Sequence, residues 1–275
     1  MKQSALTYIL GAFFCLYVLF LYGPMFVIFV LSFQGPTGGM TFPMQGVSLH
    51  WFKELWSQNT SGDVAGSFQR SLILGLVVMV ITVVVSVAAG FGFRRNFPGA
   101  KVVFYSAIIS LIMPGFLISF GLGLILQLMD IEAQWFTSAL GAQLTWTLPF
   151  GLLIMFAVLA RFDRSVEEAS QDLGATRRQT LQHITLPLLA PGIVGVALFG
   201  FTLSYDEIPR TTLVVGDSNT LPMEVLAMTN TLTTPSLYAI GTITTLVSLI
   251  CIGLALFSVT RMQRRTGIRG VKSDG

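Results

Sequence analysis

The sequence predicts an all-α membrane protein with six transmembrane helices. Of its 275 residues, 53% are hydrophobic and only 11% are charged, whereas soluble proteins carry about 25% charged residues. Apolar stretches long enough to cross a bilayer as a helix, roughly 20 residues, recur along the chain. Because a helix satisfies its own backbone hydrogen bonds inside lipid, stretches of this length favour helices over a barrel.

Six such stretches follow one another along the chain. The first covers residues 8–33; it is too long for a secretory signal and no small-residue cleavage site follows it, so we expect it to be retained. Pro114 and Pro149 fall inside later stretches and are expected to break or kink their helices. The other stretches cover residues 71–93, 102–127 and 140–160, a fifth that begins near Pro191, and residues 238–260.

Basic residues collect on one side of the predicted membrane. Only Lys53, Arg70 and Arg210 of the 16 Lys and Arg residues fall on the other side. Loops that stay in the cytoplasm carry the basic excess, so both termini are predicted to be cytoplasmic and the net charge of +3 reflects topology rather than nucleic-acid binding. The remaining thirteen are Lys2, Arg94, Arg95, Lys101, Arg161, Arg164, Arg177, Arg178, Arg261, Arg264, Arg265, Arg269 and Lys272.

The stretches divide the chain into three parts. Residues 1–70 hold the first helix and an outer loop, residues 71–262 hold five helices and an inner loop at 161–190, and residues 263–275 form a cytoplasmic tail. The outer loop turns amphipathic and aromatic around Trp51, Phe52 and Trp56. This favours a helix lying at the membrane surface, with a docking surface for an external partner as the alternative.

Sequence patterns for catalysis and metal binding are missing. Cys15 and Cys251 each lie in the middle of a predicted span, and His50 and His183 have no ligand-spaced partner, so we expect neither a disulfide framework nor a metal site. No G-x-x-x-x-G-K-[ST] loop for ATP phosphates occurs, nor H-E-x-x-H or G-x-S-x-G. The chain is therefore predicted not to be an enzyme and to hold no cofactor of its own.

The inner loop predicts two short helices joined by a turn. Gly174 lies between them, where a helix end commonly needs a left-handed residue, and Pro187 is expected to limit the second helix. Their first turns are marked by two capping boxes, Ser165 with Glu168 and Thr176 with Gln179. An exposed amphipathic hairpin of this kind suits insertion into a partner's groove, although an ordinary capped connector has the same pattern.

The same loop resembles the EAA loop of ATP-binding-cassette (ABC) importer permeases. That pattern is E-A-A, three residues, G, nine residues, I, one residue, and L-P. Only Ser170 departs from it, replacing the second alanine with another small residue. The matching positions are Glu168, Ala169, Ser170, Gly174, Ile184, Leu186 and Pro187.

The resemblance implies a type I importer permease fold whose hairpin is a coupling helix docked on a separate ATPase. Glu168 would make the polar contact, Ala169 and Ser170 would allow close approach, and Gly174 would make the turn. The implied assembly contains two ATPase subunits that bind ATP and Mg²⁺, a second and distinct homologous permease subunit, and a periplasmic substrate-binding protein. Its implied location is the inner membrane of a bacterium.

Two carboxylates in the fifth apolar stretch, Asp206 and Glu207, form the other unusual feature. With a helix that begins at Pro191, Asp206 lies roughly 22 Å along it. It is then within the hydrocarbon and must face a hydrated cavity or a cation. With a helix that begins at Ile184, both carboxylates reach the outer interface and need no such explanation.

The segment F-T-L-S-Y-D-E from Phe201 resembles the spermidine/putrescine branch of these permeases, in particular its C-type subunit. The resemblance implies a small cationic cargo. Asp206 and Glu207 would be its counter-charges and Tyr205 a cation-binding aromatic. Trp146 would add a second aromatic face, or it packs in the interior.

Other functions remain to be compared with this one. The same fold could import an amino acid derivative, an opine or ferric iron. A proton-coupled secondary transporter would use Asp206 and Glu207 as a relay, and a structural scaffold would use neither. The EAA loop argues against these last two classes, because neither needs a hairpin for docking an ATPase.

Overall fold

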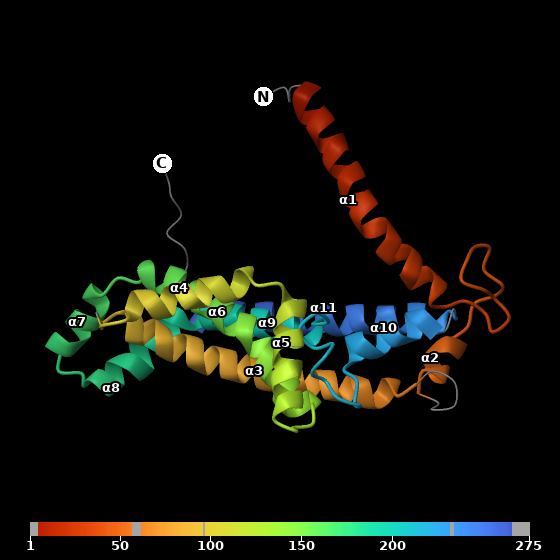
Figure 1. The fold of residues 1–275 in the computed structure, drawn as a ribbon. Coiled ribbons are helices and arrows are strands. Elements are labelled where there is room, and N and C mark those ends of the chain that lie inside the picture. Colours follow the sequence, from red (N-terminus) through yellow and green to blue (C-terminus); the bar gives the residue numbers. More distant parts are fainter. Residues whose placement is uncertain (1–4, 57–61, 96, 232–233, 266–275) are drawn as a thin grey trace. The chain divides into compact units, whose positions relative to one another are not determined.

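The computed structural model describes residues 5–56, 62–95, 97–231 and 234–265 (Figure 1). Three basic residues used for the predicted orientation, Lys2, Arg269 and Lys272, lie outside these ranges, as does the predicted tail beyond residue 265. The side chains of Arg264 and Arg265 are also not described. Within the described ranges the regular structure is helical, apart from one isolated bridge between Gln34 and Val47.

Five helices in the described part of the chain are long and apolar enough to cross a membrane, and a bent helix pair makes a sixth when it is counted as one span. This agrees with the six predicted stretches. By their contacts the helices divide into a smaller unit, residues 1–65 and 224–247, and a larger unit, residues 66–223 and 248–275. The two units are described separately below.

The smaller unit contains α1 (Ala5–Leu31), α2 (His50–Glu54), most of α10 (Leu221–Thr231) and the start of α11 (Ser236–Arg265). Its outer loop is organised by Gln34, which is buried. The Gln34 side-chain amide donates to the Gly39 carbonyl at 3.0 Å and its oxygen accepts from the Gln45 amide at 2.7 Å. The Tyr238 hydroxyl ties α11 to this loop through the Met40 carbonyl, at 2.8 Å.

Helix α2 is the short aromatic helix expected in the outer loop, but only one of its faces is open. Trp51 and Leu55 are buried inside the smaller unit, and the Trp51 indole donates to the Gly35 carbonyl at 3.3 Å. Leu49 and Trp56 are exposed. The exposed side chains are available to a membrane surface or a partner, and the choice between these two predictions stays open.

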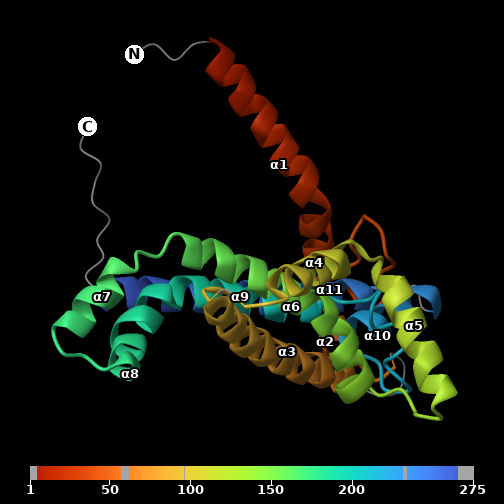
Figure 2. The same cartoon turned by 60° about the vertical axis from the view of Figure 1, so that its left-hand side comes forward.

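The larger unit is built on α3 (Val64–Phe93), α6 (Leu140–Ala160) and α9 (Leu186–Tyr205), which run alongside one another in both views (Figures 1 and 2). Met155, Leu189 and Val196 form a buried cluster between α6 and α9. Close approach depends on small residues, as is common where helices pack in membranes. A Cβ on Gly151 would overlap the Ser86 hydroxyl and lie 2.8 Å from Thr82 Cγ2, both on α3.

The third predicted span is two helices rather than one. α4 (Ala100–Ile112) and α5 (Gly115–Leu128) meet at an angle of 104°. The break falls at Met113 and Pro114, whose backbone is extended, because proline lacks an N–H and disfavours helical geometry in the residue before it. The fourth predicted span begins with the π-helical turn η1 (Trp135–Ala139) and continues as α6. Pro149 lies inside α6 and does not end it, since the helix continues to Ala160.

The fifth predicted span begins earlier than the sequence indicated. α8 (Arg177–Thr180), the π-helical turn η2 (Leu181–Thr185) and α9 follow one another without a break and form one helix of 29 residues. The start near Pro191 is therefore wrong, and so is the expectation that Pro187 limits the helix. The wide turn η2 directly precedes Pro187, where the proline ring would otherwise crowd the carbonyl of residue 183.

We expect Gly151→Val to destabilise the larger unit, because its side chain would collide with Thr82 and Ser86 on α3. Overpacking of this kind costs about 1–3 kcal/mol. Thermal unfolding of the purified protein in detergent measures the effect as a lower Tm. Gly141→Val on the same helix is the control, because nothing lies within 4 Å of a Cβ at Gly141. Equal Tm values for the two variants would contradict the close packing of α6 on α3.

Candidate functional site

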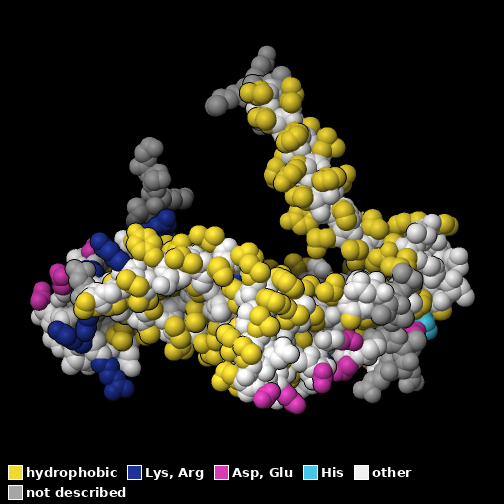
Figure 3. All heavy atoms as spheres, in the orientation of Figure 1, with side chains coloured by type: hydrophobic (Ala, Val, Ile, Leu, Met, Phe, Trp, Pro, Cys, Tyr) yellow, Lys and Arg dark blue, Asp and Glu magenta, His cyan; other side chains and the backbone are white. Residues whose placement is uncertain are grey.

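The inner loop forms the predicted hairpin at one end of the larger unit. α7 (Ser165–Asp172) is followed by Gly174, which has a left-handed backbone with φ of +87°, and then by α8. Thr176 caps α8 in a full capping box with Gln179, its hydroxyl accepting from the Gln179 amide. The helix–turn–helix form, the role of Gly174 and this cap are confirmed. Lys and Arg side chains gather over this end of the unit (Figure 3).

The other predicted capping box, Ser165 with Glu168, is wrong. Ser165 is the first residue of α7 and its side chain accepts no capping hydrogen bond. Instead its amide donates to Asp163 Oδ1 at 2.9 Å. In a capping box the Ser165 amide would donate to the Glu168 carboxylate, and the Ser165 hydroxyl would accept from the Glu168 amide. Here the Asp163 carboxylate accepts from the Ser165 amide, and the Glu168 amide donates to the Arg164 carbonyl at 3.1 Å. The bonds from Ser165 hold the pKa of Asp163 below its usual value.

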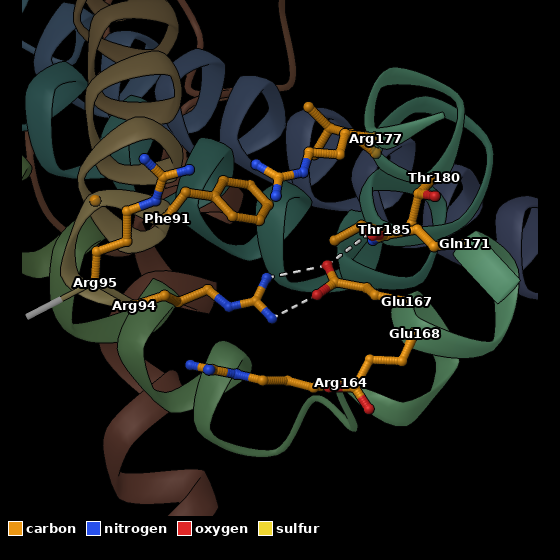
Figure 4. A pocket seen from close by; sticks show the side chains of 12 residues that line it. Phe91, Arg94, Arg95, Arg164, Glu167, Glu168, Gln171, Arg177, Thr180 and Thr185 are labelled. Carbon is orange, nitrogen blue, oxygen red and sulfur yellow. Dashed lines mark hydrogen bonds and ion pairs between the residues drawn. The ribbon is translucent and has the colours of Figure 1, made fainter. Parts of the chain in front are cut away.

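Glu167 is the internal anchor of the hairpin. Its carboxylate takes a fork of two hydrogen bonds from the Arg94 guanidinium, at 3.0 and 2.6 Å, and a third at 2.8 Å from the hydroxyl of Thr185 (Figure 4). These groups come from the end of α3, from α7 and from η2. The bonds from Arg94 are the largest cause of a lowered pKa for Glu167. Sequence reasoning missed this role, because Arg94 and Glu167 lie 73 residues apart.

Ser170 also faces the interior of the hairpin. It is 8% exposed, and its hydroxyl lies 2.8 Å from that of Thr180 on α8 and 2.8 Å from the Glu167 carbonyl that accepts its proton. The small residue at this EAA position therefore lets α7 pack on α8, and we do not expect it to touch a partner itself. Ile184, Leu186 and Pro187 are partly buried in the helix that follows.

The exposed edge of the hairpin includes Glu168, Ala169, Leu173 and Gly174. Leu173 is 91% exposed, an unusual state for a leucine on a short polar helix. Next to this edge lies a cleft of about 650 Å³, bounded by the end of α3, α7 and α8. Arg95, Arg164 and Arg177 line it together with the Arg94–Glu167 pair (Figure 4).

The acidic pair lies at the other end of the long helix. α9 ends at Tyr205, so Asp206 and Glu207 follow the helix rather than lying inside it. This result excludes a helix that begins at Pro191 and carries Asp206 inside the hydrocarbon. It agrees better with the alternative helix start at Ile184. Asp206 is exposed, whereas Glu207 is 3% exposed. Tyr205 is buried and stacks on Phe201, with ring centroids 5.5 Å apart.

Arg210 brings two of the predicted substrate residues together. Its guanidinium Nη1 lies 3.7 Å from Glu207 Oε1, which also accepts the Arg210 backbone amide at 2.8 Å. The same guanidinium lies over the Trp146 ring, 4.5 Å from the ring centroid. Trp146 therefore faces a cation that belongs to the protein itself. The sequence contained a signal for this contact, since Arg210 is three residues after Glu207 and is one of only three basic residues on its side.

A buried polar network beside this pair also escaped sequence reasoning. The Gln143 amide donates to the Thr211 hydroxyl at 3.0 Å, and its oxygen accepts from the Ser204 hydroxyl at 2.5 Å. The network connects α6, the end of α9 and the segment that follows it. Within the described ranges, no three His, Cys, Asp or Glu residues come together in a way that could hold a metal ion.

Comparisons with known proteins place these features among transport systems. The family described as "Binding-protein-dependent transport system inner membrane component" matches residues 82–268. The chain is 28% identical to the spermidine/putrescine transport system permease protein PotC of Haemophilus influenzae, over 86% of this chain and 90% of that protein. It is 27% identical to the putrescine transport system permease protein PotI of Escherichia coli, over 82% and 81%.

Solved structures show the same fold. A chain of a bacterial alginate ABC transporter matches with a TM-score of 0.65 at 16% identity, over 97% of this chain and 96% of that one. A chain of the MetNI methionine ABC transporter matches with a TM-score of 0.56 at 14% identity, over 77% and 97%. Identities this low establish a likeness of fold alone.

We expect Glu167→Gln to loosen the hairpin, because the neutral amide loses the charge-assisted fork to Arg94. If the hairpin loses about 1–2 kcal/mol of stability, its open state becomes roughly 5- to 30-fold more populated and its amides exchange faster by the same factor. Hydrogen exchange of the α7 amides measures it. Since the folded pKa of Glu167 is lowered, this stabilisation is present at neutral pH and is lost as the pH falls below 4.5, the usual pKa of a glutamate, and through the folded pKa.

Glu168→Gln, an exposed neighbour with the same chemistry, is the control and should leave exchange in α7 unchanged. Similar exchange rates in both variants would show that the contact between Glu167 and Arg94 does not hold the hairpin.

Proposed function

Because the chain belongs to the family of binding-protein-dependent transport system inner membrane components, we propose that it carries a small organic cation, with a polyamine as cargo. Membership of this family makes the chain the permease subunit of an ABC importer, a multi-pass membrane component and not an enzyme. The expected ABC permease fold is confirmed as well. The cargo, the docking residues and the partner chains are proposals.

One observation supports coupling between the hairpin and the acidic pair in such a permease. The helix Arg177–Tyr205 begins in the hairpin and ends directly before Asp206, without a break. At 1.5 Å per residue its 29 residues extend roughly 44 Å. A displacement of the hairpin would therefore be passed along one continuous helix to the acidic pair. Ile184, Leu186 and Pro187 lie in the first half of this helix and would transmit the movement rather than bind a ligand.

The hairpin is proposed to dock on an ATPase subunit. Its exposed edge offers a carboxylate at Glu168, close approach at Ala169 and Gly174, and an apolar side chain at Leu173. These are the properties of a helix that inserts into a partner's groove. Since the sequence contains no phosphate-binding loop, ATP and Mg²⁺ are assigned to two partner ATPase subunits.

A cationic cargo is supported by the distribution of acidic residues. Asp206 is exposed directly after the long helix, and Glu207 follows it. Glu132 and Asp217 line a common cleft of about 250 Å³. Carboxylates that gather on loops attract cations and raise their local concentration. The relatives PotC and PotI are described as permeases for spermidine/putrescine and for putrescine, both of which are multiply charged amines.

The remaining partners follow from the kind of transporter. A permease of this class works as one of two, and we propose a distinct homologous chain as the second, together with a periplasmic substrate-binding protein. The exposed apolar side chains of α4 and α5 supply surface for lipid or for that second permease. The proposed location is the inner membrane of a bacterium, with both termini in the cytoplasm as the basic residues indicate.

Glu168→Lys should weaken docking of the ATPase while the protein stays in the membrane. A reversed charge at the proposed contact turns attraction into repulsion and should lower the ATPase that co-purifies with the permease by about tenfold or more. Asp172→Lys, the same reversal on the same exposed helix, is the matched control and should retain the ATPase. Undiminished co-purification with Glu168→Lys would contradict the coupling role.

Asp206→Asn should slow uptake of labelled putrescine into proteoliposomes supplied with ATP and saturating binding protein. An exposed charge pair at contact contributes about 1 kcal/mol, so we expect a reduction of roughly fivefold. Asp130→Asn, another exposed acid, tests whether the effect is one of general surface charge and should transport normally. Wild-type uptake by Asp206→Asn would exclude this residue from the cation path.

A further inference from the structure

Arg210 occupies a place in the larger unit that has the chemistry of an organic-cation site. Three groups surround its guanidinium: the face of Trp146 at 4.5 Å, the carboxylate of Glu207 at 3.7 Å, and the backbone carbonyl of Met113 at 3.4 Å. An aromatic face, a carboxylate and a carbonyl are the groups with which proteins bind ammonium and guanidinium ions. The carbonyl is available because the chain breaks at Pro114 between α4 and α5.

The guanidinium is held loosely for so buried a charge. Arg210 is 6% exposed and has five N–H donors, yet its Nε has no hydrogen-bond partner. Its distance from Glu207 exceeds a hydrogen bond, and its bond to Met113 is long. The pair of Arg94 and Glu167 in the same unit shows the contrast, with two bonds of 3.0 and 2.6 Å in a fork.

Burial of Glu207 nevertheless requires a positive charge beside it. A carboxylate that is 3% exposed and loses its partner becomes an uncompensated buried charge, which is strongly unfavourable. The site can therefore exchange one cation for another, but it cannot stand empty without cost. Asp206, the adjacent residue, is exposed and gives an incoming cation a first contact.

We infer that Trp146, Glu207 and the Met113 carbonyl form a cation seat which Arg210 fills in the absence of cargo, and from which an ammonium group of the cargo displaces it. The seat holds one positive charge before and after the exchange, so the buried charge of Glu207 stays compensated throughout. Because Glu207 and Arg210 are both buried here, the exchange requires the opening that a transport cycle provides. This inference rests on the proposed function and assigns Arg210 as the residue that keeps the seat closed.

The test removes the resident cation and supplies a free one. In the purified intact transporter, Arg210→Gln should lower the Tm, because Glu207 then becomes a buried carboxylate with no positive charge beside it. Millimolar methylguanidinium or spermidine should then restore part of that loss, whereas the wild type should show no shift with either compound. Sodium chloride at equal ionic strength serves as the control for screening.

The double variant Arg210→Gln with Glu207→Gln defines the seat. Without the carboxylate there is no buried charge to compensate, so its Tm should not respond to either cation. A response that persists in the double variant, or no cation-specific response in Arg210→Gln, would overturn the inference. If Arg210→Gln does not assemble, methylguanidinium present during solubilisation should restore assembly, and failure to do so also counts against the seat.

The two cations separate this inference from the proposed cargo. Stabilisation of Arg210→Gln by methylguanidinium but not by spermidine would support the seat and contradict a polyamine as its ligand. Stabilisation by both compounds supports the seat and its proposed ligand together.

Discussion

The fold is governed by one constraint: lipid offers no hydrogen-bond partner and no counter-charge to a polar group. Most charged residues in the described part of the larger unit therefore lie near helix ends, in the hairpin or in the segments between helices. The continuous helix Arg177–Tyr205 obeys this rule along its whole length, since its charged residues are confined to its first turn and the carboxylates follow its last residue. The basic hairpin at the start of this helix and the acidic pair after its end both follow from keeping charges out of the span.

This helix continues through a position where the sequence suggests that it should end. Pro187 and Pro191 both lie within it, and proline in a helix interior removes a hydrogen bond and crowds the preceding turn. The wide turn η2 relieves that crowding before Pro187. The EAA residues Ile184, Leu186 and Pro187 therefore belong to the place where the hairpin becomes a span. Pro187, which the sequence suggested as the end of a helix, instead lies where the hairpin helix continues into the span.

Sequence reasoning succeeded where the determining forces are local. The apolar stretches, the left-handed Gly174 and the cap at Thr176 each depend on a few adjacent residues, and each was predicted. It failed where several groups compete for one donor or where the partner is distant in the sequence. At the start of α7 the Ser165 amide donates to Asp163 and not to Glu168, Glu167 pairs with Arg94 across 73 residues, and Trp146 lies against Arg210. No single-sequence periodicity encodes such pairings, because they depend on how helices are placed in space.

Two Arg–Glu pairs in the described part of the larger unit, Arg94 with Glu167 and Arg210 with Glu207, differ in geometry in a way that fits their positions. At the hairpin, Glu167 is held by a fork from Arg94 and by Thr185, so the three elements are joined and, under the proposed docking, would move as one body. A loose contact there would absorb the movement instead of transmitting it. Beyond the end of the same helix, Glu207 and Arg210 are 3.7 Å apart with a donor unused. A tight fork there would hold the site shut against any cargo. The proposed rigid coupling at one end and the proposed exchangeable charge at the other would thus use the same residue types, and hydrogen-bond geometry would decide between them.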